Sequence, residues 1–203
     1  MISSVLTDII SNVEHVFIKP YQVSRTADLK IKCIDELVAS FNEAEILKKE
    51  CRERSFVFHF NVDGGVLFYP YLYRVLYKHS FLYKIVFDLN GVPDFEGNND
   101  TVFMNNVISL TAIGIDFWMT NGSLNELAVN ERERFDWDGF ILDANLILSD
   151  INHGEQKKIY DYIWYLSSKR IPVGIDTEVS CDMFSFLKSL GVTIFKKTTN
   201  SFS

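Results

Sequence analysis

The chain has little cysteine, and its few cysteines lie too far apart to act together. There are three, none of them in a Cys-x-x-Cys pair: Cys33, Cys51 and Cys181. Such spacing predicts neither a disulfide framework nor a zinc site, and it is typical of a reduced cytoplasmic protein. The four histidines are equally scattered, and we expect each to be a surface or packing residue: His15, His59, His79 and His153.

Long apolar runs and an excess of positive charge are lacking too. No run approaches the roughly 20 apolar residues of a membrane span. The first residues include Asp8 and Glu14 and no early positive charge, which argues against a signal peptide. A net charge of −7 disfavours a broad nucleic-acid surface, although it leaves room for a basic protein partner. We therefore expect a cytoplasmic protein that contacts neither membrane nor nucleic acid directly.

What the chain does have is a large apolar fraction without internal repeats or linkers. Its 203 residues are 47% hydrophobic and include 17 Phe, which predicts one packed domain over residues 1–203. Expected strands are 15–23, 29–40, 56–61, 83–89, 113–118, 139–143, 172–175 and 192–195. Expected helices are 42–54, 70–79, 100–112, 155–169 and 179–190. This alternation favours an α/β fold with a mostly parallel sheet, either a barrel or an open sheet.

The segment 171–191 carries the clearest local pattern, a short strand followed by a turn and a helix. Gly174 permits close backbone approach at the strand. Thr177 is expected to cap the helix, with Glu178 in the first turn near the positive end of the helix dipole. Gly191 is expected to end the helix in a left-handed conformation. On a parallel sheet, the carboxyl end of such a strand is where ligands usually bind.

The residues Val173-Gly174-Ile175-Asp176-Thr177 resemble the Glu-Gly-Val-Glu-Thr turn of EAL-domain cyclic-di-GMP phosphodiesterases. The resemblance implies a modified TIM-type (β/α) barrel, here truncated, and it favours a barrel over an open sheet. In the family, carboxylates and an Asn hold two divalent metals that activate a water, assisted by a Lys and a Glu. Here the first acid of the turn is Val173, which can neither accept a proton nor orient a water.

Followed along the chain, the resemblance begins with Tyr21-Gln22-Val23 at the family's Tyr-Gln-Pro. Glu36 stands in Glu36-Leu37-Val38 at the Glu-Ala-Leu position, Asn61 at a metal-binding Asn, and Asp88 at the first acid of Glu-Ile-Thr-Glu. Asp143 ends the counterpart of Lys-Ile-Asp, and Asp176 lies in the turn already described. The resemblance thus implies five vestigial pocket positions: Glu36, Asn61, Asp88, Asp143 and Asp176. Asp143 and Asp176 are expected to serve as structural caps or backbone anchors.

Other groups that the family's chemistry needs are missing. Trp118 and Met119 are expected at the two positions of the metal-binding Asp pair, and Asp116 nearby is expected to point to the opposite face of its strand. The catalytic Lys is absent before Asp143, and Lys196-Lys197 replaces the family's Gln-Gly. We therefore expect no catalytic residue, no bound metal and no cofactor. No dinucleotide, P-loop, metalloprotease or serine-hydrolase motif offers another chemistry.

Two surface features remain as candidate contact sites. On the helix expected at 70–79, one face carries Leu72, Val75, Leu76 and His79. The residues Phe68, Tyr71, Arg74 and Tyr77 form a candidate partner-binding patch, because Tyr and Arg dominate binding hot spots; alternatively, the tyrosines only cover neighbouring loops. The loops expected at 91–99 and 120–138 are polar, and the longer one is either a solvated excursion or a partner-binding loop.

Together these features predict a non-enzymatic EAL-like protein that acts by protein–protein binding. The Gly-Ile-Asp-Thr-Glu turn and the run Asn98-Asn99-Asp100-Thr101 are similar to those of short EAL-like regulators that bind the flagellar master regulator FlhDC. That resemblance implies control of a transcription regulator of motility genes. The alternatives are a non-catalytic cyclic-di-GMP receptor, in which Lys196 and Lys197 meet a phosphate, and an active phosphodiesterase with a rearranged metal site.

Overall fold

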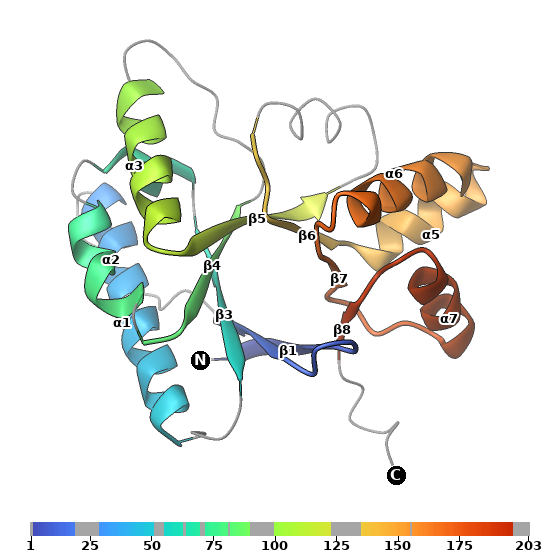
Figure 1. Ribbon diagram of the computed structural model, residues 1–203, viewed down its shortest axis with the longest axis horizontal. Coiled ribbons are helices and arrows are strands. Elements are labelled where there is room, and N and C mark those ends of the chain that lie inside the picture. The colour runs from blue at the N-terminus through green and yellow to red at the C-terminus, as the bar shows by residue number, and fades with distance from the viewer. Residues whose placement is uncertain are drawn as a thin grey trace.

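The computed structural model describes residues 2–18, 29–50, 55–62, 64–69, 72–80, 82–89, 100–122, 135–154 and 156–196. Within them, eight strands form a closed barrel in the order of the chain (Figure 1). The strands are β1 (Ile2–Asp8), β2 (Glu14–Ile18), β3 (Phe56–Asn61), β4 (Lys84–Leu89), β5 (Ile115–Gly122), β6 (Gly139–Leu142), β7 (Val173–Ile175) and β8 (Ile194–Lys196).

The barrel is parallel except at its first strand. From β2 to β8 every neighbouring pair is parallel, whereas β1 runs antiparallel to both β2 and β8. The described helices are α1 (Leu29–Glu50), α2 (Leu72–Ser80), α3 (Asp100–Ala112), α5 (Ala144–Asn152), α6 (Gln156–Ser168) and α7 (Cys181–Ser189), with a 3-10 helix η1 at Gly64–Phe68. Helices α1 to α3 lie on one side of the barrel and α5 to α7 on the other (Figure 1). The predicted α/β barrel is therefore confirmed.

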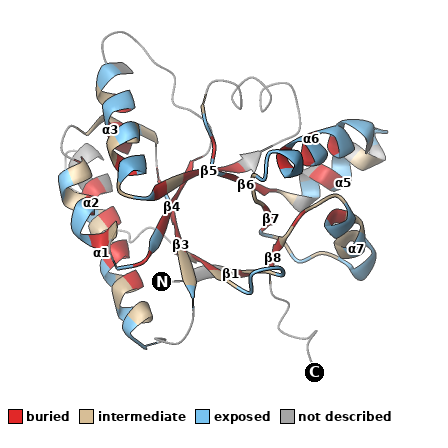
Figure 2. Cartoon of the chain, in the orientation of Figure 1, coloured by how far each residue is buried: buried red, intermediate tan, exposed pale blue. Residues whose placement is uncertain are grey.

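Side chains alternate between the two faces of each strand, so the buried residues form two sets, one inside the barrel and one outside it. One set comes from seven of the eight strands, and only the barrel interior can bring it together: Leu6, Val86, Trp118, Ile141 and Ile194, with Phe17 and Val57 partly buried beside them. The residues between these, such as Phe58, Phe87 and Phe117, pack outward with helix residues in the larger core. This second layer, red on the strands in Figure 2, attaches the helices to the barrel.

The strand predicted at 29–40 is wrong, because these residues belong to helix α1. Its buried residues Ile34, Leu37, Phe41 and Ala44 recur at helical spacing and pack on the outside of the barrel. Strand β1, in contrast, was not predicted. The expected number of strands is therefore right only because one false strand replaces one missed strand. Helix α5 was also missed, while β3 and α3 have the predicted bounds.

The segment 171–191 folds as a strand, a turn and a helix, but its cap differs from the prediction. Ser180 caps α7, accepting a hydrogen bond from the Met183 amide at 3.3 Å, and the acid in the first turn is Asp182. The helix starts later than expected, so neither Thr177 nor Glu178 has its predicted role. Gly191 is left-handed, with φ of 104°, as predicted.

Close packing at Gly174 also agrees with the prediction. A Cβ there would lie 2.8 Å from Cδ1 of Ile141 and 3.2 Å from Ile194 inside the barrel. Of the expected loops, 91–99 lies outside the described residues, and the loop expected at 120–138 begins within strand β5. Among the described helices none is both long and apolar enough to cross a membrane.

Candidate functional site

Three neighbouring strands bring Asn61, Asp88 and Trp118 to one level near the carboxyl ends of the barrel strands. Asn61 of β3 pairs with Asp88 of β4, and Asp88 pairs with Trp118 of β5. Paired residues on adjacent strands point to the same face of a sheet, and Trp118 lies in the interior cluster. Asn61 is exposed at the mouth, whereas Asp88 is buried. Two of the five predicted pocket positions therefore lie together.

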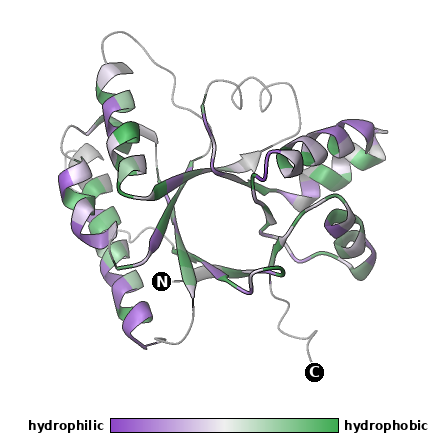
Figure 3. Ribbon diagram, viewed as in Figure 1, coloured by the Kyte–Doolittle hydropathy of each residue, from purple (hydrophilic) through white to green (hydrophobic). Residues whose placement is uncertain are grey.

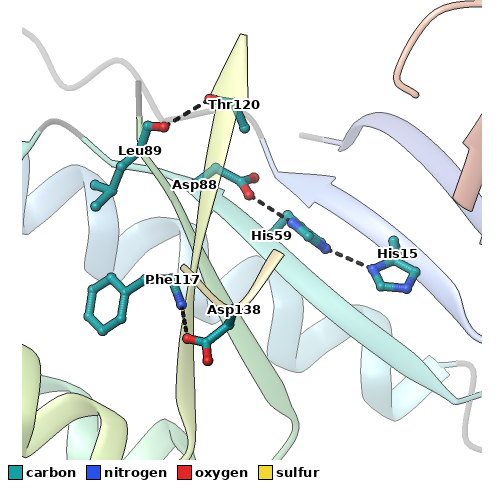
Figure 4. Close-up of polar contacts among 7 residues, drawn as sticks. All are labelled: His15, His59, Asp88, Leu89, Phe117, Thr120 and Asp138. Carbon is teal, nitrogen blue, oxygen red and sulfur yellow. Dashed lines mark hydrogen bonds and ion pairs between the residues drawn. The ribbon is translucent and has the colours of Figure 1, made fainter. Parts of the chain in front are cut away.

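Below this level, a chain of hydrogen bonds crosses the barrel interior (Figure 4). Nδ1 of His59 lies 2.9 Å from Oδ1 of Asp88, and Nε2 of His59 lies 2.8 Å from Nδ1 of His15. The three side chains come from β2, β3 and β4 and are all buried, with exposed fractions of 6%, 0% and 1% for His15, His59 and Asp88. Because a carboxylate only accepts, His59 donates from Nδ1 to Asp88. A neutral His59 in this tautomer has a lone pair at Nε2, which accepts from the Nδ1–H of His15.

The first imidazole of this chain is held neutral by its surroundings. Burial lowers the pKa of His15 from 6.5 to about 3, with a further lowering from His59 and a partial opposing effect from Asp8. Burial in a medium of low polarity disfavours the protonated form of histidine. His15 therefore fills the barrel as a polar but uncharged side chain, and its Nδ1–H has a fixed acceptor.

Aromatic rings close the space around the two imidazoles. The His59 ring stacks on Phe17, with ring centres 4.2 Å apart, and meets the edge of Trp118 at 4.9 Å. Trp118 also lies 5.5 Å from His15. The indole lies directly over Gly139, where a Cβ would be 2.3 Å from its ring atoms. The barrel interior at this level is therefore occupied by the chain's own side chains.

The histidine chain is the part of the site that sequence reasoning missed. His15 and His59 were expected to be isolated surface or packing residues, and the structure makes them a connected buried pair. A signal was available in β3, where Val57, His59 and Asn61 alternate with three phenylalanines. Such alternation predicts that one face holds His59 and Asn61 together. Only the pairing of β2 with β3 shows that His15 joins them.

The other predicted pocket positions lie elsewhere. Glu36 is half-buried in helix α1, within the segment that was expected to be a strand, and so it does not lie beside Asn61 and Asp88 on the barrel strands. Asp143 caps α5, where its carboxylate accepts from the Asn145 amide at 2.7 Å, in agreement with the structural role predicted for it. Asp176 is exposed and accepts from the Thr177 hydroxyl at 3.0 Å. Tyr21-Gln22-Val23 and Lys197 lie outside the described residues.

Strand β5 places its residues differently from the prediction. Trp118 points into the barrel, but Met119 points outward and packs in the layer beneath the helices. Asp116 has the same parity as Trp118, so it shares the interior-facing side and does not point to the opposite face. It is displaced toward the amino end of the strand instead, where it pairs with Lys84. Thr120 follows on the inner side and donates to the Leu89 carbonyl at 3.4 Å.

The amino end of the barrel carries a second polar group, formed by Lys84, Asp116 and Asp138. Lys84 also donates to the Gly114 carbonyl at 2.9 Å. Asp138 accepts from the Phe117 amide at 2.9 Å (Figure 4), and burial raises the pKa of its carboxyl above the ordinary value while that hydrogen bond lowers it. These contacts join β4, β5 and β6 at their starts and are structural. In the part of the chain that the structure describes, no three His, Cys, Asp or Glu side chains are arranged to hold a metal ion.

The predicted partner-binding patch is only partly a surface. Phe68 is half-buried in η1, with its ring 5.4 Å from that of Phe103, and so belongs to the core rim. Arg74 and Tyr77 are exposed on α2, and Tyr71 lies outside the described residues. On the inner side of the same helix, the predicted face is confirmed, since Leu72, Leu76 and His79 are buried.

Comparisons with known proteins find similarity at the level of structure only. No family model matches the sequence, and no curated protein matches it. The calcium and cyclic-di-GMP complex of BlrP1 from Klebsiella pneumoniae has a TM-score of 0.72 and 14% identity, over 96% of this chain and 53% of the other. An EAL domain protein from Listeria monocytogenes has a TM-score of 0.67 and 12% identity, over 96% of this chain and 84% of the other.

The Vibrio cholerae LapD fragment with S helix, GGDEF and EAL parts, bound to cyclic-di-GMP, has a TM-score of 0.65 and 14% identity. It is covered over 52% of its length by 98% of this chain, so the chain spans about half of the longer structures that it matches. At these identities the similarity concerns the fold. The closed barrel, the antiparallel first strand and the outer helices of this chain have the architecture of an EAL domain.

Proposed function

We propose that this chain is a non-enzymatic EAL-fold regulator that acts in the cytoplasm by binding another protein. The observation that carries the proposal is the state of Asp88, the acid in the pocket position for which the sequence resemblance is most direct. Its Oδ1 accepts from His59, and Trp118 fills the barrel beside it. A carboxylate used as the anchor of a buried histidine chain is unavailable as an unencumbered metal ligand.

Two energetic costs oppose metal binding at this level. Turning Asp88 toward a cation would leave the buried Nδ1–H of His59 without its acceptor, which costs about 1–3 kcal/mol. The neighbouring position on β5 carries Trp118, an indole with no oxygen ligand for a hard cation. These costs support a scaffold without hydrolytic chemistry, so that the function lies in the outer surface.

For the partner, we propose the flagellar master regulator FlhDC, following the resemblance of the 174–178 turn. Binding would sequester a regulator of motility genes and would need no cofactor. The pull-down that tests this uses purified FlhDC and the full chain. Retention of FlhDC, and loss of its binding to promoter DNA when the chain is added, is the expected result. FlhDC that passes through unretained would rule out this partner.

A cyclic-di-GMP receptor is the second candidate, because BlrP1 and LapD, which share the fold, were solved with that nucleotide. Lys196 offers one cation for it, since it lies half-buried at the carboxyl end of β8 and faces the interior like Ile194. Isothermal titration with cyclic-di-GMP, with Mg²⁺ and Ca²⁺ added in turn, distinguishes a receptor and an enzyme from a protein that does not bind the nucleotide. We expect no heat at high micromolar nucleotide. Saturable heat that Lys196→Ala abolishes would establish a receptor, and metal-dependent turnover would establish an enzyme.

A further inference from the structure

We propose that the outer face of helix α6 is the docking surface for an acidic helical segment of a protein partner. The α6 face consists of the exposed side chains of Lys157, Lys158, Tyr160 and Trp164 on the helix, with Lys169 and Arg170 in the turn directly after it. The inference rests on the proposed function in one respect, since it supplies the surface through which a protein-binding chain would act. It differs from the sequence-based expectation, which placed the contact on α2.

The unusual feature of this face is Trp164, which is 70% exposed. The other two tryptophans, Trp118 and Trp137, are 3% and 6% exposed. Tyr160, one helical turn away, is 44% exposed and touches Phe186 of α7 with its ring edge. The opposite side of α6 packs on the barrel through the buried residues Ile159, Ile163 and Leu166. Tyr160 thus helps to pack α6 on α7, whereas Trp164 is not needed to attach the helix. Exposed aromatic side chains of this kind are typical binding anchors.

The charge of the α6 face indicates which kind of partner binds there. The described, exposed side chains of residues 157–170 include four cations and one carboxylate, Asp161, although the whole chain has a net charge of −7. Lys157 lies in the first turn of α6, where the helix dipole disfavours a cation. Helix stability therefore does not account for it. A positive, aromatic face on an acidic protein is complementary to an acidic partner.

The length of the face sets the geometry of that partner. Lys157 and Lys169 are twelve positions apart, which corresponds to about 18 Å along a helix at 1.5 Å per residue. A partner helix with Glu or Asp near both ends and small or apolar side chains between them would meet both cations and cover Trp164. Figure 3 shows hydrophilic and hydrophobic residues alternating along α6, and the hydrophobic residues Ile159, Ile163 and Leu166 are buried, so the outward side is polar and aromatic.

Other occupants fit this face less well. A second copy of the chain related by a two-fold axis would bring the same patch against itself and so place lysine against lysine. An anionic membrane needs a broad apolar face to bury, but the apolar face of α6 is already packed on the barrel. Nucleic acid would meet only four cations on a chain of net charge −7, which gives little backbone affinity.

The test uses a fluorescein-labelled, alanine-based helical peptide with glutamates at both ends and leucines in the middle, measured by anisotropy with the full-length chain. We expect saturable binding that weakens as salt is raised, because exposed charges are screened. Trp164→Ala is expected to weaken binding about 30-fold, the size of a hot-spot loss. The double variant Lys157→Glu, Lys169→Glu should abolish it. The matched control is Lys78→Glu, an exposed cation on α2, which should bind like the unmodified chain. Arg74→Glu, in the candidate α2 patch, is measured beside it, and circular dichroism confirms folding.

Three results would overturn the proposal. The first is that the charge reversal leaves the peptide affinity unchanged. The second is that a peptide with lysines in place of the glutamates binds equally well. The third is that phosphatidylglycerol vesicles shift the Trp164 emission and the glutamate peptide does not. Running the same variants against FlhDC separates the two proposals. Loss of FlhDC binding only with Arg74→Glu overturns the α6 face and keeps the proposed function. Peptide binding without FlhDC binding supports the α6 face and removes FlhDC as the partner.

Discussion

Acidification should destabilise this protein, and the contribution of His15 can be measured separately from the others. The imidazole is buried beside His59 and Trp118, and burial lowers its pKa from 6.5 to about 3. In the unfolded chain His15 regains its ordinary pKa, so the unfolded state binds a proton at a higher pH than the folded state does. The stabilising contribution is therefore complete above about pH 6.5 and is lost as the pH falls toward 3.

The magnitude follows from the two pKa values. At pH 5 the unfolded chain is almost fully protonated at His15 and the folded protein almost not at all, which gives a loss of about 2 kcal/mol relative to neutral pH. The full loss below the folded pKa is about 5 kcal/mol, at roughly 1.4 kcal/mol for each pKa unit. For a domain of this size, a loss of 2 kcal/mol lowers the melting temperature by about 4–8 °C.

The assay is urea unfolding at several pH values from about 7.5 to 5, with the chain and with His15→Asn. Asparagine places an amide N–H near the position of Nδ1, so it can still donate to His59 without titrating in this range. Other groups, including His79, whose pKa burial also lowers, contribute equally to both proteins and cancel in the difference. The two stability curves should therefore converge by about 2 kcal/mol as the pH falls to 5. Parallel curves would refute a buried neutral His15.

Three further predictions concern packing and polar contacts. Asp88→Leu should lower the free energy of unfolding by about 2–3 kcal/mol, because the Nδ1–H of His59 loses its acceptor, whereas Asp88→Asn, which keeps an oxygen there, should cost about 1 kcal/mol or less; equal costs in chemical denaturation would contradict this hydrogen bond. Gly139→Ala should cost at least about 1–3 kcal/mol, since its Cβ would fall 2.3 Å from the Trp118 ring, and an unchanged melting temperature would show that the indole lies elsewhere. Ser180→Ala should cost about 1 kcal/mol through loss of the helix cap, with Ser180→Asp as the control that restores it.

Periodicity predicted the strands with strong one-face patterns and failed where the pattern was ambiguous. Phe56–Asn61 alternates strictly, and β3 has the predicted bounds. The 29–40 segment is rich in Ile, Leu and Val, which suit either a strand or a buried helix; the helix forms because Ile34, Leu37 and Phe41 fit one face of α1. Strand β1 was missed because more than half of Ile2–Asp8 is polar, and the strand is held by pairing on both sides, which local sequence does not reveal.

The candidate site was likewise predicted only in part from the sequence. Resemblance placed Asn61 and Asp88 in one pocket, and the strand register brings them together. It placed Glu36 with them, but residues 29–50, between the first two strands and β3, fold as a helix on the outside of the barrel. The resemblance implied a pocket that lacks most of the family's metal-binding and catalytic groups, and the histidines were expected to be isolated from it. The structure instead has a buried His15–His59–Asp88 chain, because β2, β3 and β4 are adjacent and their inward residues meet.

The sequence by itself determined the class of the fold, the outward and inward sides of its clearest strands, the left-handed end at Gly191 and the close approach at Gly174. Each of these was predicted from a residue type or a pattern within a few residues, where sterics and periodicity act, although the side chains that Gly174 meets come from other strands. Only the tertiary structure decided that Asp88 serves His59, that Trp118 fills the barrel over Gly139, and that Trp164 remains exposed. These depend on contacts between residues 21 to 44 positions apart or on the absence of a covering element, and no local pattern specifies them.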